Sequence, residues 1–204
     1  MQSFRTYLTE KTNSPGLTVF DIDDTLFKTK AQVKVIDKDG KVVKVLQSKE
    51  YNTHKLKPGE KFDYGEFKDA KNFAKTSVPM KKMIDKAKQI IQRASAKGSK
   101  VIIITARADF DNKKVFLDTF RKAGIDIDKV YVERAGNLNL GSSAKNKKFI
   151  FHKYLSGDKY ARVRFFDDDV SNLRMFNALK KKYPNVDFNA YRVSDDGSVK
   201  KYKK

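Results

Sequence analysis

Short apolar runs alternate along the chain with longer segments in which apolar residues keep helical spacing. The short runs are typical of strands that are covered on both faces of a parallel sheet. They lie at residues 17–20, 101–104 and 130–132. Residues 162–166 and 186–190 mix apolar with charged or polar positions and are also predicted to form strands. The helical segments lie at residues 79–94, 113–123, 145–155 and 170–183, with Pro79 expected to open the first of them. Strands and helices that alternate in this way predict a mostly parallel sheet between two layers of helices.

A long polar segment separates the first strand from the first helix. Residues 31–47 alternate between apolar and polar positions around Asp39-Gly40, a pair that is typical of a tight hairpin turn. Residues 48–76 predict irregular structure with short helices. Their aromatic side chains could contact a substrate base, but we expect them to cover a small core. These are Tyr51, Phe62, Tyr64, Phe67 and Phe73. A shorter hairpin is predicted around Asp196-Gly197.

The first strand leads directly into the segment Asp21-Ile22-Asp23-Asp24-Thr25. Carboxylates at the end of a buried strand are costly unless a cation is bound there. Asp21 and Asp23 can converge on one point from the strand end and its loop, and oxygen ligands of this kind suit Mg²⁺. An Asp beside Mg²⁺ can also attack phosphorus. The alternative interpretation is an acidic turn, because Asp and Thr favour turns for local reasons.

Three later segments carry polar groups that fit the same chemistry. Thr105 ends the run at residues 101–104, and an acidic pair, Asp167 and Asp168, ends the run at residues 162–166. A group of lysines lies between them, just before an apolar helical stretch; it consists of Lys145, Lys147 and Lys148. A hydroxyl and an ammonium group can both bind phosphate oxygens. Because open α/β sheets bind ligands at the carboxyl ends of their strands, these groups are expected to share one site.

In this order the motifs resemble those of the haloacid dehalogenase-like (HAD) phosphohydrolases, over roughly residues 17–193. The resemblance implies an α/β fold, a three-layer Rossmann-like parallel sheet with an inserted cap or β-hairpin after the first strand. Residues 17–204 would then form the phosphatase domain, with a cap insertion at about 28–76. Residues 1–16 would be a leader or a peripheral segment.

The resemblance also implies roles for the acidic residues. Asp21 matches the nucleophile, and Asp23 matches the general acid and base two residues further on. The carboxylate at Asp23 implies phosphoryl chemistry, because family members that cleave carbon–halogen bonds lack it. Asp167 and Asp168 match the acidic pair that binds the metal, so the expected Mg²⁺ ligands are Asp21, Asp23, Asp167 and Asp168.

The phosphate-binding groups follow from the same resemblance. Thr105 matches the phosphate-binding hydroxyl, and Arg107 and Lys145 are further candidates for substrate binding. Among the lysines we prefer Lys147 as the catalytic residue, because it keeps helical spacing to apolar positions. Lys145 is the next candidate, and Lys148 is the third.

Three residues near these motifs receive lesser roles. Asp24 is expected not to contact the metal or the reacting groups directly, and to serve as a turn or cap residue. Asp169 is expected to begin the following helix, where acidic residues suit the exposed N–H groups. Asn172 could reach the metal, but we expect it on the surface of that helix.

The charge of the chain adds a possible class of partner. The formal net charge is +20, and there is no cysteine, which excludes disulfides, thiolate metal sites and cysteine nucleophiles. So large a positive charge attracts polyanions such as nucleic acid, in a manner that salt should weaken. The expected function is therefore a Mg²⁺-dependent phosphatase acting on a nucleotide or on a nucleic-acid terminal phosphate. The alternatives are a polyanion-binding virion protein with little turnover and a sugar-phosphate phosphatase.

The first ten residues resemble the leader peptides of large tailed bacteriophages. In those leaders a protease cuts after a Leu/Ile-x-Glu pattern, which predicts cleavage after Glu10 here. The alternative is a short amphipathic helix that packs on the domain. No apolar run is long enough to span a membrane. We therefore expect a soluble protein without a membrane partner, located in the host cytoplasm or packaged in a phage head.

Overall fold

A central sheet with six strands organises the chain, in the order β11-β10-β9-β1-β7-β8. The computed structural model describes residues 15–51, 54–96 and 98–203. Neighbouring strands of this sheet run parallel, except that β11 is antiparallel to β10 at one edge. The strands are β1 (Gly16–Phe20), β7 (Lys100–Thr105), β8 (Tyr131–Arg134), β9 (Arg162–Asp167), β10 (Asp187–Val193) and β11 (Val199–Tyr202).

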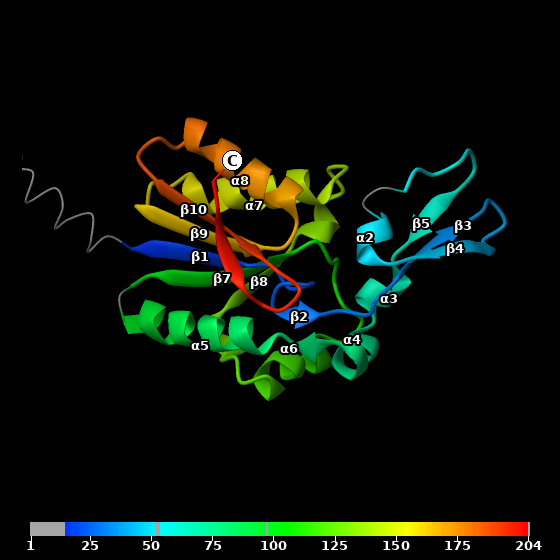
Figure 1. The fold of residues 1–204 in the computed structure, drawn as a ribbon, viewed down its shortest axis with the longest axis horizontal. Coiled ribbons are helices and arrows are strands. Elements are labelled where there is room, and N and C mark those ends of the chain that lie inside the picture. The colour runs from blue at the N-terminus through cyan, green and yellow to red at the C-terminus, as the bar shows by residue number, and fades with distance from the viewer. Residues whose placement is uncertain (1–14, 52–53, 97, 204) are drawn as a thin grey trace, which may run out of the picture.

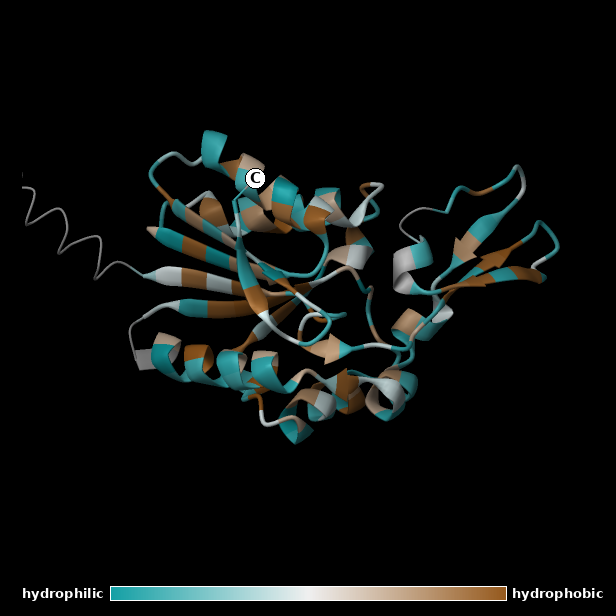
Figure 2. Ribbon diagram, in the orientation of Figure 1, coloured by the Kyte–Doolittle hydropathy of each residue, from teal (hydrophilic) through white to brown (hydrophobic). Residues whose placement is uncertain are grey.

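Helices cover both faces of this sheet (Figure 1). One layer contains α4 (Ala70–Thr76), α5 (Lys81–Ala96) and α6 (Lys113–Lys122), and the other contains α7 (Ser143–Leu155) and α8 (Val170–Ala178). Two separate apolar clusters fill the spaces between the sheet and these two layers. Figure 2 shows the hydrophobic strand residues between the helices. The predicted α/β architecture with a mostly parallel sheet is confirmed.

The register of the sheet brings three strand ends to one edge. Phe20 at the end of β1 pairs with Ile103 of β7 and with Phe166 of β9. After β1 the chain builds the sheet outward through β7 and β8, and then returns to the other side of β1 with β9 and β10. The crevice between β1 and β9 is therefore the point at which the strand order reverses, where open α/β sheets bind ligands.

A second, smaller sheet lies beside this edge (Figure 1). It is antiparallel, with the strand order β4-β3-β5. Its strands are β3 (Val33–Ile36), β4 (Val42–Leu46) and β5 (Lys61–Asp63), accompanied by the short helices α2 (Ser48–Tyr51) and α3 (Gly65–Lys68). The hairpin around Asp39-Gly40 is confirmed, because β3 pairs with β4 and Gly40 takes a positive φ of 81° in the turn. The strand β5 was not apparent from the sequence.

The first long helix begins later than predicted. Pro79 belongs to β6 (Val78–Pro79), which pairs with β2 (Phe27–Lys28), and α5 starts at Lys81. The prediction that Pro79 opens the helix was therefore wrong. Pro79 pairs with Phe27, and the next N–H, that of Met80, donates to the Leu26 carbonyl at 2.9 Å, so the chain is still extended beside β2 at this point.

The end of the chain agrees with expectation in part. The predicted hairpin around Asp196-Gly197 is confirmed by the antiparallel pairing of β10 with β11. The helix expected at 170–183 ends earlier, because α8 stops at Ala178 and the 3₁₀ turn η3 (Leu179–Lys181) follows it. Two further 3₁₀ turns flank β8, namely η1 (Ile127–Lys129) and η2 (Ala135–Leu138).

The predicted leader and its cleavage after Glu10 lie outside the described residues, so both stay predictions. Within the described part of the chain, each helix is too short or too polar to cross a membrane.

Candidate active site

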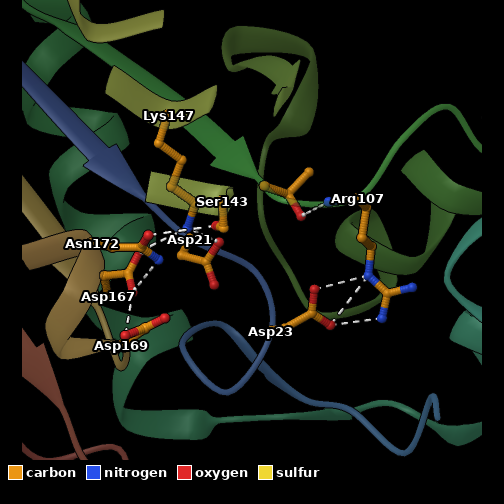
Figure 3. A network of polar contacts seen from close by, with 9 residues as sticks. Asp21, Asp23, Arg107, Ser143, Lys147, Asp167, Asp169 and Asn172 are labelled. Atoms are coloured by element: carbon orange, nitrogen blue, oxygen red, sulfur yellow. Dashed lines mark hydrogen bonds and ion pairs between the residues drawn. The ribbon is translucent and has the colours of Figure 1, made fainter. Parts of the chain in front are cut away.

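A buried lysine joins two carboxylates at the reversal point of the sheet. Asp21 follows β1, Asp167 ends β9, and Lys147 reaches them from α7 (Figure 3). Lys147 Nζ donates to Asp21 Oδ1 and to Asp167 Oδ2, at 2.7 Å in each case. All three residues are buried. Burial alone would lower the pKa of Lys147, but the two carboxylates hold it above its usual range, so this ammonium stays charged.

The local helix pattern explains why Lys147 is the lysine that turns inward. The Ser142 side chain caps α7 by accepting from the Lys145 N–H, which fixes where the helix begins. Ile150 and Phe151 are buried three and four residues after Lys147, so these positions share one face. Lys145 and Lys148 are exposed. Of the three candidate lysines, the structure brings Lys147 alone to Asp21.

Both oxygens of the Asp167 carboxylate accept hydrogen bonds from other residues. Besides Lys147, it accepts from Asn172 Nδ2 at 3.1 Å on each oxygen, and Asp167 Oδ1 also accepts from the Asp169 N–H at 2.9 Å. Its side chain is buried and does not line the cavity described below. Asn172 is therefore buried in the first turn of α8, and the expectation of a surface position was wrong. Asp169 does cap α8, as predicted.

Asp168 differs from its neighbour because its carboxylate faces the cavity. It makes no hydrogen bond with any other residue that the structure describes. Burial, followed by the charges of Asp167 and Asp21, raises the pKa of Asp168 to about 9. Burial also raises the pKa of Asp21 to about 8, although the Lys147 ammonium lowers it. Three carboxylates around a single ammonium leave an excess of negative charge, which a divalent cation would offset.

The donor set fits a hard cation such as Mg²⁺. Asp21 Oδ2 accepts no hydrogen bond from another described residue, and the Asp168 carboxylate is equally open. Mg²⁺ is commonly bound by one or two carboxylates, with water and substrate phosphate completing its shell. Within the described ranges, no three or more His, Cys, Asp or Glu side chains form a complete metal site.

A second buried cation, Arg107, holds Asp23 (Figure 3). Arg107 follows β7, and its Nε donates to Asp23 Oδ2 at 2.9 Å while its Nη2 donates to Asp23 Oδ1 at 2.6 Å. The same guanidinium donates to the Phe67 carbonyl of α3 and to Thr29 Oγ1, both at 3.0 Å. The Arg107 side chain is 1% exposed and that of Asp23 is 20% exposed. Arg107 therefore ties the Asp23 carboxylate to the segment between β1 and β7.

Aromatic rings surround this guanidinium. Its central carbon lies 4.6 Å from the ring centre of Phe67, 5.0 Å from that of Phe73 and 5.5 Å from that of Phe110. Contacts of this kind are attractive for a desolvated cation and leave it little freedom. Arg107 was predicted to bind substrate, but its contacts are therefore mainly with Asp23 and the residues around it. Thr105 is also buried, and its Oγ1 accepts from the Arg107 N–H at 3.2 Å.

A cavity of about 460 Å³ opens between the central sheet and the small sheet. Its floor includes carboxylates from the loops after β1 and β9, namely Asp21, Asp23, Asp24, Asp168 and Asp169. Three basic residues also line it, and these are Lys68, Arg107 and Lys147. The small sheet contributes an apolar and aromatic wall formed by Val33, Tyr51, Tyr64 and Phe67. The predicted site residues Asp21, Asp23, Arg107, Lys147 and Asp168 thus share one cavity.

Sequence reasoning missed the segment between β8 and α7 and the start of α7 itself. Asn139, Ser143 and Asn146 line the cavity, and the buried Asn146 Oδ1 accepts from the Leu140 N–H at 2.9 Å. Asn139 takes a left-handed backbone with φ of 50°. The available signal was the cap residue Ser142, because a helix that begins at this edge presents its first turn to the cavity.

Comparison with known proteins gives a family and a similarity to solved structures. Residues 1–153 match the family described as "Protein of unknown function (DUF2608)". No curated protein matches the chain. A solved structure, the HAD domain of effector protein Lem4 from Legionella pneumophila, is similar with a TM-score of 0.44 and 13% sequence identity. The similarity covers 88% of this chain and 86% of that one.

Proposed function

We infer from its site that this chain, which belongs to the family described as "Protein of unknown function (DUF2608)", is a Mg²⁺-dependent phosphatase. The reaction is the hydrolysis of a phosphate monoester through an aspartyl-phosphate at Asp21. One observation carries this proposal. Lys147 holds one oxygen of Asp21 at 2.7 Å and leaves the other without a hydrogen bond from a described residue, and Asp21 lines a cavity together with Asp23.

In this proposal Asp21 is the nucleophile. With Oδ1 fixed by Lys147, Oδ2 attacks phosphorus and a bond to phosphorus forms as the ester bond to the leaving oxygen breaks. The Lys147 ammonium keeps Asp21 oriented and balances part of the negative charge at the reacting phosphoryl group. Asp167 accepts from Lys147, and Asn172 donates to Asp167, so both act as positioning residues.

In the same proposal Asp23 transfers protons in both halves of the reaction. In its acid form Asp23 gives its proton to the leaving oxygen, and the resulting carboxylate takes a proton from the water that attacks phosphorus in the aspartyl-phosphate, which restores the acid form. That second attack releases phosphate and restores the Asp21 carboxylate. Arg107 acts through Asp23 as a positioning residue, because two hydrogen bonds fix the carboxylate.

Asp21 and Asp168 are the residues that would hold Mg²⁺, together with the backbone carbonyl of Asp23. When bound, the ion supplies neutralisation of phosphate charge. Asp167 was also expected as a ligand, but its hydrogen bonds to Lys147, Asn172 and the Asp169 N–H favour a supporting role. Asp168 has no such partner among the described residues.

The proposed substrate is a nucleotide or a nucleic-acid terminal phosphate. The net charge of +20 supports a polyanionic or nucleotide partner, because it draws anions towards the molecule. The same charge favours the second candidate, a polyanion-binding protein with little turnover. We also propose that the segment at about 28–76 acts as a cap, because Tyr51, Tyr64 and Phe67 line the same cavity as Asp21.

Release of inorganic phosphate tests this function. The substrates are nucleoside monophosphates, 5′- and 3′-phosphorylated oligonucleotides and sugar phosphates, each with Mg²⁺ and with excess chelator. We expect turnover with Mg²⁺, loss with chelator and recovery on adding Mg²⁺ or Mn²⁺. Asp168→Asn should raise the Mg²⁺ concentration that is needed. Full turnover in excess chelator would exclude the proposal, and binding to DNA without any turnover would favour the second candidate.

A further inference from the structure

Two tyrosines from the segment that contains the small sheet line the same cavity as the carboxylates. Tyr51 ends α2, and Tyr64 lies between β5 and α3. Their hydroxyl oxygens are 3.0 Å apart, and their ring centres are 5.8 Å apart at an interplanar angle of 84°. Phe62 packs against Tyr51 with ring centres 4.9 Å apart. These contacts hold the two rings in fixed positions.

Packing against the small apolar core explains the positions of only some of these aromatic side chains. Val33, Val35 and Leu46 form that core, and Tyr51, Phe62 and Phe67 pack against it. Tyr64 does not belong to this cluster and is 40% exposed, although it lines a concave cavity. A large aromatic side chain that is left open inside a cavity is a feature of ligand sites, which combine apolar walls with a few convergent polar groups.

The charged side chains that line the cavity limit how much negative charge a ligand can carry. Two of its three basic residues already hold carboxylates, since Lys147 binds Asp21 and Arg107 binds Asp23. Lys68 is the basic lining residue that remains. A nucleic-acid strand needs a groove of cations that follows its backbone. The cavity therefore suits one phosphate with an uncharged flat group rather than a run of phosphates.

We propose that Tyr51 and Tyr64 form a subsite for the base of a nucleoside monophosphate whose phosphate lies at Asp21. This proposal rests on the proposed phosphatase function and narrows its substrate. Each base offers a flat face for stacking on an aromatic ring. The paired hydroxyls add a donor and an acceptor for the edge of the base. A volume of about 460 Å³ lies within the usual range for small-molecule sites.

The test compares two substrates that differ only in the base. The first is a nucleoside 5′-monophosphate, and the second is ribose 5-phosphate, which has the same sugar and phosphate. We expect wild-type kcat/KM to favour the nucleotide by about 5- to 150-fold, the range that base–aromatic stacking supports. In Tyr64→Leu this ratio should fall to nearly one, whereas Tyr64→Phe, which keeps the ring, should retain most of it.

Tyr131→Leu is the matched control, because Tyr131 is 57% exposed on β8 and does not line the cavity. Its kcat/KM ratio should equal that of the wild type. Equal turnover of both substrates by the wild type would overturn the subsite and leave the phosphatase function standing. A higher kcat/KM for a 5′-phosphorylated oligonucleotide or for an aryl phosphate than for the mononucleotide would also overturn the subsite and leave the phosphatase function standing. Absence of turnover on every phosphate monoester would overturn the subsite and the function together.

Discussion

Lys147 and Arg107 perform similar tasks in different parts of the molecule. Each is a buried cation that holds a carboxylate of the loop after β1. Lys147 and its partners all come from the central sheet and its covering helices. Arg107 instead donates to Thr29 and to the Phe67 carbonyl, which belong to the segment between β1 and β7.

The difference separates the two chemical roles proposed for the site. The position of Asp21 depends on elements that form the main core, so it should not change when the small sheet moves. The position of Asp23 depends on Arg107, and hence on α3 and the residues next to β2. Substitutions in the two groups should therefore affect different quantities.

The largest expected effect is that of Asp21→Asn. Without the nucleophile, turnover should fall by more than about 10⁴-fold, as happens when a nucleophile is removed from other enzymes. The matched control is Asp39→Asn in the exposed turn of the hairpin, which should leave turnover unchanged. Near-normal turnover in Asp21→Asn would remove the basis for the Lys147 group as the reaction centre.

Lys147→Met should damage folding as well as catalysis. The substitution leaves Asp21 and Asp167 buried without their cation, which typically costs about 3–5 kcal/mol of the free energy of unfolding. Urea denaturation measures this loss. Lys148→Met is the control, because Lys148 is exposed on the same helix, and it should change the free energy by less than about 0.5 kcal/mol. An equal effect of the two substitutions would contradict the role given to Lys147.

Arg107→Lys should show a dependence on the leaving group. Lysine cannot make the paired hydrogen bonds that hold Asp23. Poor leaving groups need a proton from Asp23, so kcat/KM for an alkyl phosphate should fall by about 10²-fold or more. For p-nitrophenyl phosphate, whose leaving group needs little protonation, the loss should be much smaller. Asp23→Asn should give the same pattern.

Equal losses on both substrates in Arg107→Lys would indicate a purely structural role. A rise in KM on both substrates with unchanged kcat would instead assign Arg107 to phosphate binding, as the sequence predicted.

The smallest expected effect concerns the surface charge away from Lys147, Arg107 and their partners. Binding of DNA should be weak, insensitive to sequence and weaker as salt rises. Exposed lysines on the edge strand β11 are suitable for testing this. Replacing Lys200 and Lys201 by Gln should weaken DNA binding modestly and reduce its salt dependence, while phosphate release stays unchanged. Fluorescence anisotropy across a salt series measures both quantities, and binding that is independent of salt would contradict the electrostatic interpretation.

Lys147 with its partners and Arg107 with its partners also differ in how far the sequence could predict them. Asp21, Thr105 and Asp167 each follow a short apolar run, and helical spacing singled out Lys147. Local patterns were sufficient there because strand ends in a parallel sheet meet at one edge. Arg107 donates directly to Asp23, and it also donates to Thr29 and Phe67; these partners are all far from Arg107 in sequence. No local pattern encodes such a contact, and the same is true of the buried position of Asn172.

The most direct test of the account is to trap the covalent intermediate. The Asp23→Asn variant should form the aspartyl-phosphate from p-nitrophenyl phosphate but hydrolyse it slowly, since the water lacks its base. Borohydride reduces an aspartyl-phosphate to homoserine, which peptide mass spectrometry can locate. We predict homoserine at position 21, dependent on substrate and absent from Asp21→Asn. Homoserine at position 168, or turnover without any trapped intermediate, would contradict the assignment of Asp21 as the nucleophile.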